Sequence, residues 1–255
     1  MRFSLASLCL TAIMWSAAAR ADDLTVAAAS DLQYALRDGA ARFERATGHH
    51  VRLTFGSSGN FFAQISNGAP FDVFLSADTE YPRKLIDAGA ADRESFFVYG
   101  TGTIVVWVPQ SSPIDPNQGL KVLLDPRVRK IALANPAYAP YGRAAVAALR
   151  HEGLFDAVSG KFVLGENLTQ AMQFVESGNA DAGLVGLSLA IAPPMQGKGR
   201  YWVVPRSFYP RMEQAAVIVS HSTKKQAASA FLAFLRRPEI VELLARHGIE
   251  PAGTP

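Results

Sequence analysis

Residues 24–43 read LTVAAASDLQYALRDGAARF, a short β-type run followed at once by a helical pattern. Leu32, Leu36 and Phe43 fall on one face of the predicted helix. The alternation recurs in strand-like runs at 51–55, 73–75, 104–108, 131–134 and 162–164, and in helical patterns at 61–65, 81–88, 143–152, 169–176 and 224–247. This order predicts an α/β fold with mostly parallel sheets. Length alone allows either one large sheet or two lobes.

The first 21 residues have the character of a secretory signal peptide. Arg2 precedes an apolar stretch at 3–18, and Ala19-Arg20-Ala21 fits the small-x-small cleavage pattern. We therefore expect export to the periplasm, with Asp22 as the new N-terminus and no lipid anchor. No later segment reaches the roughly 18 uninterrupted apolar residues of a membrane span.

The mature chain is nearly neutral and lacks cysteine. Removing Arg2 and Arg20 lowers the 25 basic residues to 23, against 22 acidic ones, and no run of basic residues is present. Such a chain has no electrostatic footprint for nucleic acid. The single cysteine, Cys9, lies in the predicted leader, so disulfides and thiolate metal ligands are not expected.

Four predicted strand-to-helix junctions are rich in hydroxyl, amide and backbone donors. Ligands of α/β sheets bind at the carboxyl ends of strands, where such junctions lie. The beginnings of helices also attract anions through unpaired N–H groups and the helix dipole. The four junctions are AASDLQ at 28–33, FGSSGN at 55–60, NPAYAPYG at 135–142 and ENLTQ at 166–170.

Each junction also has a purely structural interpretation as a helix cap. Ser30 with Gln33 matches a capping box, and Asp31 is expected to turn outward toward the dipole. Asn167 precedes another helical pattern and is expected to cap it. Pro140 suits a first helical position, where its missing N–H costs nothing. The sequence alone does not place the four junctions together.

In their order and spacing, these motifs resemble the molybdate-binding proteins of bacterial ABC transporters, within the type II periplasmic binding protein superfamily. The resemblance spans essentially the whole mature region. Its most specific parts are AASDL at 28–32, FGSSG at 55–59, NGAPFDVFLSAD at 67–78, and NP with APYG at 135–142. It implies a two-lobed α/β fold with two crossover strands, near 102–106 and 214–219, and the ligand in the interlobe cleft. Lobe 1 would comprise 22–101 plus 213–255, and lobe 2 would comprise 102–212.

The resemblance also implies a function and a set of site residues. The protein would be a monomeric, non-enzymatic binder that captures molybdate or tungstate, without a catalytic cofactor or a bare metal ion. It would deliver the anion to an inner-membrane ABC permease and its ATPase. Ser30 and Ser58 would donate hydroxyl hydrogens, Ser57 would contribute its backbone, and Tyr141 and Leu168 would donate from the second lobe, Leu168 through its main chain only.

Two positions depart from the expected pattern. Many family members carry a ligand-binding tyrosine in the segment that matches 184–188, where this chain has Gly186. The missing donor is either lost, replaced by water or supplied by Tyr141, and we favour Tyr141. Asp31 would repel an anion unless it faces away. Arg143 is interpreted as a solvated arginine on a helix face.

Two other functions compete with anion capture. A serine hydrolase is disfavoured because no G-x-S-x-G motif is present and Ser57-Ser58 lacks a lysine or histidine at a motif spacing. A catalytic metal lacks support from any H-E-x-x-H motif, and His49-His50 is interpreted as surface. A binder of sulfate, ferric iron or an organic acid stays open, and the Tyr138/Tyr141 pair keeps iron in consideration.

Overall fold

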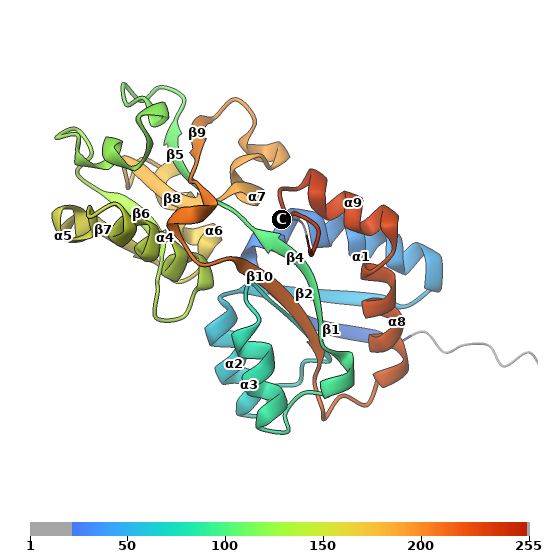
Figure 1. Ribbon diagram of the computed structural model, residues 1–255. Helices are drawn as coiled ribbons and strands as arrows, with labels where there is room; N and C mark the ends of the chain where they lie inside the picture. The colour runs from blue at the N-terminus through green and yellow to red at the C-terminus, as the bar shows by residue number, and fades with distance from the viewer. Residues whose placement is uncertain (1–21, 254–255) are drawn as a thin grey trace, which may run out of the picture.

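Two five-stranded sheets organise the computed structural model, which describes residues 22–253; the predicted signal peptide lies outside these residues. Figure 1 shows the two sheets in separate lobes, with β4 and β10 running side by side in one of them. The first sheet has the order β2-β1-β3-β10-β4. Its strands are β1 (Asp23–Ala29), β2 (His50–Gly56), β3 (Val73–Ser76), β4 (Phe97–Gly102) and β10 (Met212–Ile218).

The second sheet has the order β7-β6-β8-β5-β9. Its strands are β5 (Ile104–Pro109), β6 (Ile131–Ala134), β7 (Phe162–Gly165), β8 (Ala182–Gly186) and β9 (Gly199–Val203). In both sheets three strands are parallel, while β10 runs antiparallel to β3 and β4, and β5 runs antiparallel to β8 and β9. Four of the five strands in each sheet therefore run in the same direction, as the prediction of mostly parallel sheets requires, and only β10 and β5 run against the others. The strands β5 and β10 each enter their sheet directly from the other lobe, without a crossover helix. They therefore run antiparallel to their neighbours.

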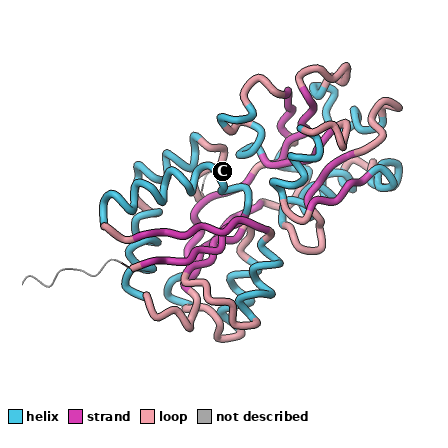
Figure 2. The backbone as a smooth tube through the Cα atoms, turned by 180° about the vertical axis from the view of Figure 1, so that it is seen from behind, coloured by secondary structure: helices cyan, strands magenta, loops and turns pink. Residues whose placement is uncertain are grey.

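Helices cover both faces of the first sheet (Figures 1 and 2). One face packs against α1 (Gln33–Thr47), α8 (Lys225–Leu235) and α9 (Pro238–Arg246), and the other against α2 (Ser58–Ser66) and α3 (Glu80–Asp87). The rings of Phe43 and Phe231 meet edge to face at 5.1 Å between centroids. A single helix over 224–247 was predicted, but Arg237 is extended before Pro238, which begins a new helix. Proline disfavours helical backbone in the residue before it.

The second sheet packs chiefly against α4 (Pro140–His151) and α6 (Leu168–Glu176). Two short helices, α5 (Phe155–Val158) and α7 (Leu187–Ala190), complete this lobe. Trp107 lies fully buried in its core. Within residues 22–253, no helix combines the length and apolar character needed to cross a membrane.

The chain passes between the sheets twice. Thr103 alone separates β4 from β5, close to the expected crossing at 102–106. The return runs through residues 204–211, between β9 and β10. The second crossing was expected at 214–219, but Gln214 to Ile218 already belong to β10 and pair inside the first sheet. The return therefore lies before that run.

Candidate functional site

A small cavity of about 10 Å³ lies where the two lobes meet, and all four predicted junctions line it. The lining residues that were not predicted are all alanine, glycine or proline, so the polar side chains come from the predicted residues. Gly186 is the one predicted site residue that does not line the cavity. The predicted residues that do line it are Ser30, Asp31, Ser57, Ser58, Tyr141 and Leu168.

Ser30 meets Leu168 across the cavity. The Leu168 N–H donates to the Ser30 Oγ at 3.1 Å, and the Thr169 hydroxyl donates to Gln33 Oε1 at 3.1 Å. The predicted capping box of Ser30 and Gln33 is therefore wrong, because both side chains bond to the start of α6 instead. Ser30 begins a 3-10 turn, η1 (Ser30–Leu32), that has no side-chain cap. A hydroxyl that accepts one bond still has a hydrogen to donate.

The cap predicted at Asn167 is confirmed. Its side chain accepts a hydrogen bond from the Gln170 N–H at 3.1 Å. The Gln170 side chain in turn accepts from the Glu166 N–H at 2.6 Å. These two bonds fix the first turn of α6 and hold the Leu168 N–H at the edge of the cavity.

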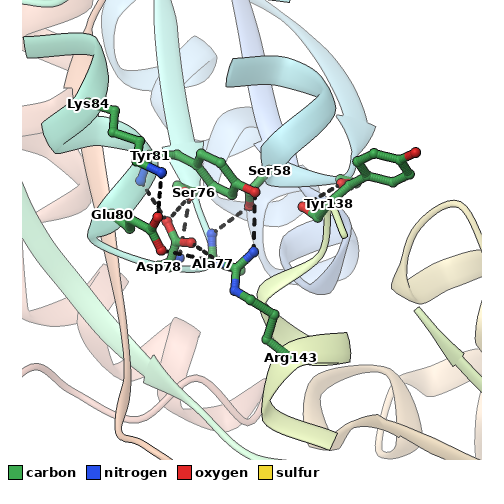
Figure 3. A network of polar contacts seen from close by, with 10 residues as sticks. Ser58, Ser76, Ala77, Asp78, Glu80, Tyr81, Lys84, Tyr138 and Arg143 are labelled. Atoms are coloured by element: carbon green, nitrogen blue, oxygen red, sulfur yellow. Dashed lines mark hydrogen bonds and ion pairs between the residues drawn. The ribbon is translucent and has the colours of Figure 1, made fainter. Parts of the chain in front are cut away.

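The adjacent serines at the start of α2 have different partners, and Figure 3 shows Ser58 beside Ala77. Ser58 Oγ accepts a hydrogen bond from the Ala77 N–H at 3.0 Å, which leaves its own hydrogen for another acceptor. Ser57 instead donates to the Tyr138 carbonyl at 2.8 Å, and the Gly59 N–H donates to the same oxygen at 2.8 Å. Ser58 therefore offers a hydroxyl hydrogen, whereas Ser57 ties the lobes together.

Tyr141 occupies the space beside Gly186. It is the second residue of α4, which begins at Pro140 as predicted, and it is 3% exposed. A Cβ at Gly186 would lie 3.0 Å from Tyr141 Cε1 and 2.7 Å from Leu168 Cδ2. The ring thus fills the volume that a side chain at 186 would need, which supports the interpretation that Tyr141 supplies the phenol.

Asp31 faces inward, so the prediction that it turns outward is wrong. It is 2% exposed, and its Oδ2 accepts hydrogen bonds from Gln214 Nε2 at 2.7 Å and from the Tyr141 hydroxyl at 3.1 Å. Burial raises the Asp31 pKa to about 6, although these two hydrogen bonds oppose the rise. The prediction failed because Tyr141 from α4 and Gln214 from β10 cover the turn that carries Asp31.

Arg143 bridges the lobes rather than lying on a solvated face. Its Nη2 lies 2.5 Å from Asp78 Oδ2, and its Nη1 donates to the Tyr81 hydroxyl at 3.2 Å (Figure 3). The guanidinium carbon also lies 5.2 Å from the centre of the Tyr81 ring. Sequence reasoning missed these partners, because Asp78 is 65 residues away along the chain.

The cavity offers dipoles rather than positive charges. The first N–H groups of an α-helix have no partner inside the helix and carry the positive end of its dipole. Starts of α2, α4 and α6 meet here with the hydroxyls of Ser30 and Ser58. Neither lysine nor arginine lines the cavity, and the described residues contain no cluster of metal ligands. Such an arrangement suits a small anion.

The geometry gives no support to an iron site built on two tyrosines or to a serine hydrolase. Tyr138 is 45% exposed and outside the cavity, so it does not share a site with the buried Tyr141. Histidine is absent from the residues that line the cavity, so within the described chain no such base adjoins Ser58 there. The neutral donors at the beginnings of helices are therefore the feature that a function must explain.

Comparison with known proteins agrees with this geometry. Residues 24–250 match the family described as bacterial extracellular solute-binding proteins. The chain is 39% identical over 250 residues to the molybdate-binding protein ModA of Azotobacter vinelandii, covering 97% of this chain and 98% of that protein. The chain belongs to this solute-binding family. A second relative, ModA of Rhodobacter capsulatus, is 35% identical over 230 residues and covers 90% of this chain and 89% of its own length.

A solved structure shows the same fold within this solute-binding family. The periplasmic molybdate-binding protein of Azotobacter vinelandii superposes with a TM-score of 0.84 at 36% sequence identity, covering 89% of this chain and 98% of that one. The predicted two-lobed α/β architecture is thereby confirmed. The relatives described here carry the names of binding proteins and not of enzymes.

Proposed function

We propose that this solute-binding protein captures molybdate, or tungstate, in the cavity between its lobes and delivers it to an inner-membrane ABC permease and its ATPase. One observation carries the proposal: the four donor-rich junctions, spread over more than 130 residues of sequence, line a single small cavity. The names and close similarity of the ModA relatives support the same ligand class.

Neutral donors can hold a dianion if enough of them point inward. Burying an unpaired charge is very costly, so the lost hydration must be replaced by hydrogen bonds. Each hydrogen bond to a charged group contributes roughly 1.5–3 kcal/mol net. Ser30, Ser58, Tyr141 and Leu168 are the proposed donors, with the backbone of Ser57 beside them. The Leu168 N–H and the Tyr141 hydroxyl would exchange their present acceptors, Ser30 Oγ and Asp31 Oδ2, for the anion. Five such bonds would contribute roughly 7–15 kcal/mol, which is of the same order as the roughly 4–15 kcal/mol cost of association.

We further propose where the protein acts and how its chain is divided. Residues 1–21 would be removed as a signal peptide, which would release the protein into the periplasm. The mature protein would be a monomer without catalytic activity, cofactor or affinity for nucleic acid. Lobe 1 would comprise residues 22–101 and 213–255, and lobe 2 residues 102–212. The separation of β1–β4 and β10 from β5–β9 into two sheets supports this division.

A thermal-shift panel tests the ligand class. A ligand that binds only the folded protein raises its stability, by about 2.7 kcal/mol at a concentration of 100 times Kd. Molybdate and tungstate are expected to raise Tm, whereas sulfate, phosphate and ferric citrate are expected to have smaller effects at equal concentration. The Ser30→Ala plus Ser58→Ala variant is the control and should lose at least tenfold in molybdate affinity. Stabilisation by ferric citrate alone would contradict the proposal.

A further inference from the structure

Asp31 is the one ionisable carboxyl group in the lining of the cavity, among the residues that the structure describes. Gln214 and Tyr141 donate to its Oδ2, as described above, whereas its Oδ1 is buried and has no hydrogen-bond partner. The amide oxygen of Gln214 also lacks a partner. The cavity therefore presents an unpaired acceptor atom of an acidic group to a ligand whose own oxygens are also acceptors.

The titratable groups around Asp31 come from several elements. Tyr141 lies on α4, Tyr99 on β4, and Tyr209 just before β10. Burial raises the pKa of Tyr99 and Tyr141 well above the ordinary value of 10, and it also raises the pKa of Tyr209, so all three phenols stay neutral near pH 7. Asp78 lies farther out and is paired with Arg143.

Of this group, Asp31 is the member that titrates close to neutral pH. Its carboxyl group is ionised in most molecules at pH 7, because burial brings its pKa only to about 6. An ionised Asp31 would place a third negative charge against a buried dianion. Like charges in contact strongly favour protonation of one of them.

We propose that Asp31 takes up one proton from solvent when the dianion binds, and that the protonated Oδ1 then donates a hydrogen bond to the anion. This inference rests on the proposed oxyanion function. The proton adds to Oδ1, no bond in the anion breaks, and the complex gains one positive charge relative to its separate parts. Asp31 thereby becomes a donor like the rest of the cavity lining, and Oδ1 gains the partner that it lacks.

Affinity must then depend on pH. Uptake of one proton for each anion bound weakens binding by up to tenfold for each pH unit above the Asp31 pKa of the free protein. Molybdate and tungstate are both dianions in this range, so the ligand itself contributes no titration. We expect Kd to rise by about 75-fold between pH 6.5 and 8.5, because the slope approaches one logarithmic unit for each pH unit only well above the free-protein pKa of about 6.

Titration calorimetry of the wild-type protein with molybdate measures the proton directly. The observed heat at pH 7.5 differs between buffers of different ionisation enthalpy by an amount proportional to the protons taken up. We expect close to one proton for each anion. Asp31→Asn keeps the size of the side chain and carries a permanent N–H donor, so its uptake should be zero and its Kd should change by less than threefold across the pH range. Asp78→Asn, the matched control outside the cavity lining, should keep the wild-type slope.

The outcomes separate this inference from the function beneath it. Tight molybdate binding with no proton uptake and no pH slope in the wild-type protein would overturn the role of Asp31 and leave the function standing. A slope that disappears in Asp78→Asn but persists in Asp31→Asn would also overturn it. If the wild-type protein binds hydrogen phosphate without proton uptake and Asp31→Asn loses this binding, then Asp31 accepts a hydrogen bond from the ligand, which would also overturn the proposal. Failure to bind molybdate or tungstate at any pH would remove the function itself.

Discussion

Replacing Ser58 with alanine separates a structural role from a ligand-binding role at one hydroxyl. The Ser58 Oγ accepts the buried Ala77 N–H at 3.0 Å, and the substitution leaves that donor unsatisfied. A buried donor without a partner costs about 1–3 kcal/mol in the free energy of unfolding. The hydroxyl hydrogen that Ser58 offers to a dianion is worth about 1.5–3 kcal/mol, which raises Kd roughly 10- to 150-fold. Denaturant unfolding measures the first loss, and calorimetry with molybdate measures the second.

Ser57→Ala is the matched control, because the same group is removed one residue away. The Ser57 hydroxyl donates to the Tyr138 carbonyl, which keeps its second hydrogen bond from the Gly59 N–H after the substitution. Nothing buried is left unsatisfied, so molybdate Kd should rise by less than about fivefold, or about 1 kcal/mol. A folded Ser58→Ala protein that binds molybdate within twofold of wild type would contradict the proposed role of this hydroxyl, as would a larger loss of affinity in Ser57→Ala.

Three further substitutions test other parts of the site. Gly186→Ala places a Cβ 3.0 Å from the Tyr141 ring. The substitution should lower the free energy of unfolding by about 1–3 kcal/mol and weaken molybdate binding. Unchanged stability and affinity would contradict this packing. Asp31→Asn should abolish the part of the pH dependence of unfolding that Asp31 causes. The Asp31 pKa is about 6 in the folded protein against 3.8 in the unfolded chain, so its stabilising effect is complete below about pH 4, and about 3 kcal/mol is lost as the pH rises through 6. The variant should therefore gain more in Tm at pH 8 than at pH 4, and equal gains would count against this role. Arg143→Gln removes a partly exposed ion pair with Asp78 that contributes about 0.2–1 kcal/mol. Because the pair spans the lobes, molybdate Kd should rise by at most about fivefold, and by less in high salt. An effect on Kd that does not depend on salt would refute an electrostatic origin.

The order of strands and helices was largely visible in the sequence, because local patterns decide it. The strand at 131–134 was predicted with its bounds, and the start of α4 at Pro140 follows from the missing N–H of proline. Strands β4, β8 and β9 were not predicted. All three include glycine, a residue that is depleted in strands. The antiparallel direction of β10 could not be predicted, because it depends on the lobe from which the chain arrives.

Most residues that line the cavity were predicted from the sequence, but their hydrogen-bond partners were not. A hydroxyl or a first N–H at the beginning of a helix has a local signature, as Ser58 and Leu168 show. The inward turn of Asp31 depends on Tyr141 and Gln214, which lie 110 and 183 residues away. The sequence offers one signal for Gln214, which is a polar residue at the head of an apolar run. In the structure its side chain is fully buried. A buried amide is seldom left without a partner.

Crystals grown with molybdate provide the most direct test of the central claim, because anomalous scattering locates the molybdenum atom. We expect one strong peak between the lobes, with anion oxygens in hydrogen-bond range of the Ser30 and Ser58 hydroxyls, the Tyr141 loop and the Leu168 N–H. No lysine or arginine side chain should touch the anion. A peak elsewhere on the protein, or an anion held chiefly by a positively charged side chain such as that of Arg143, would contradict the account.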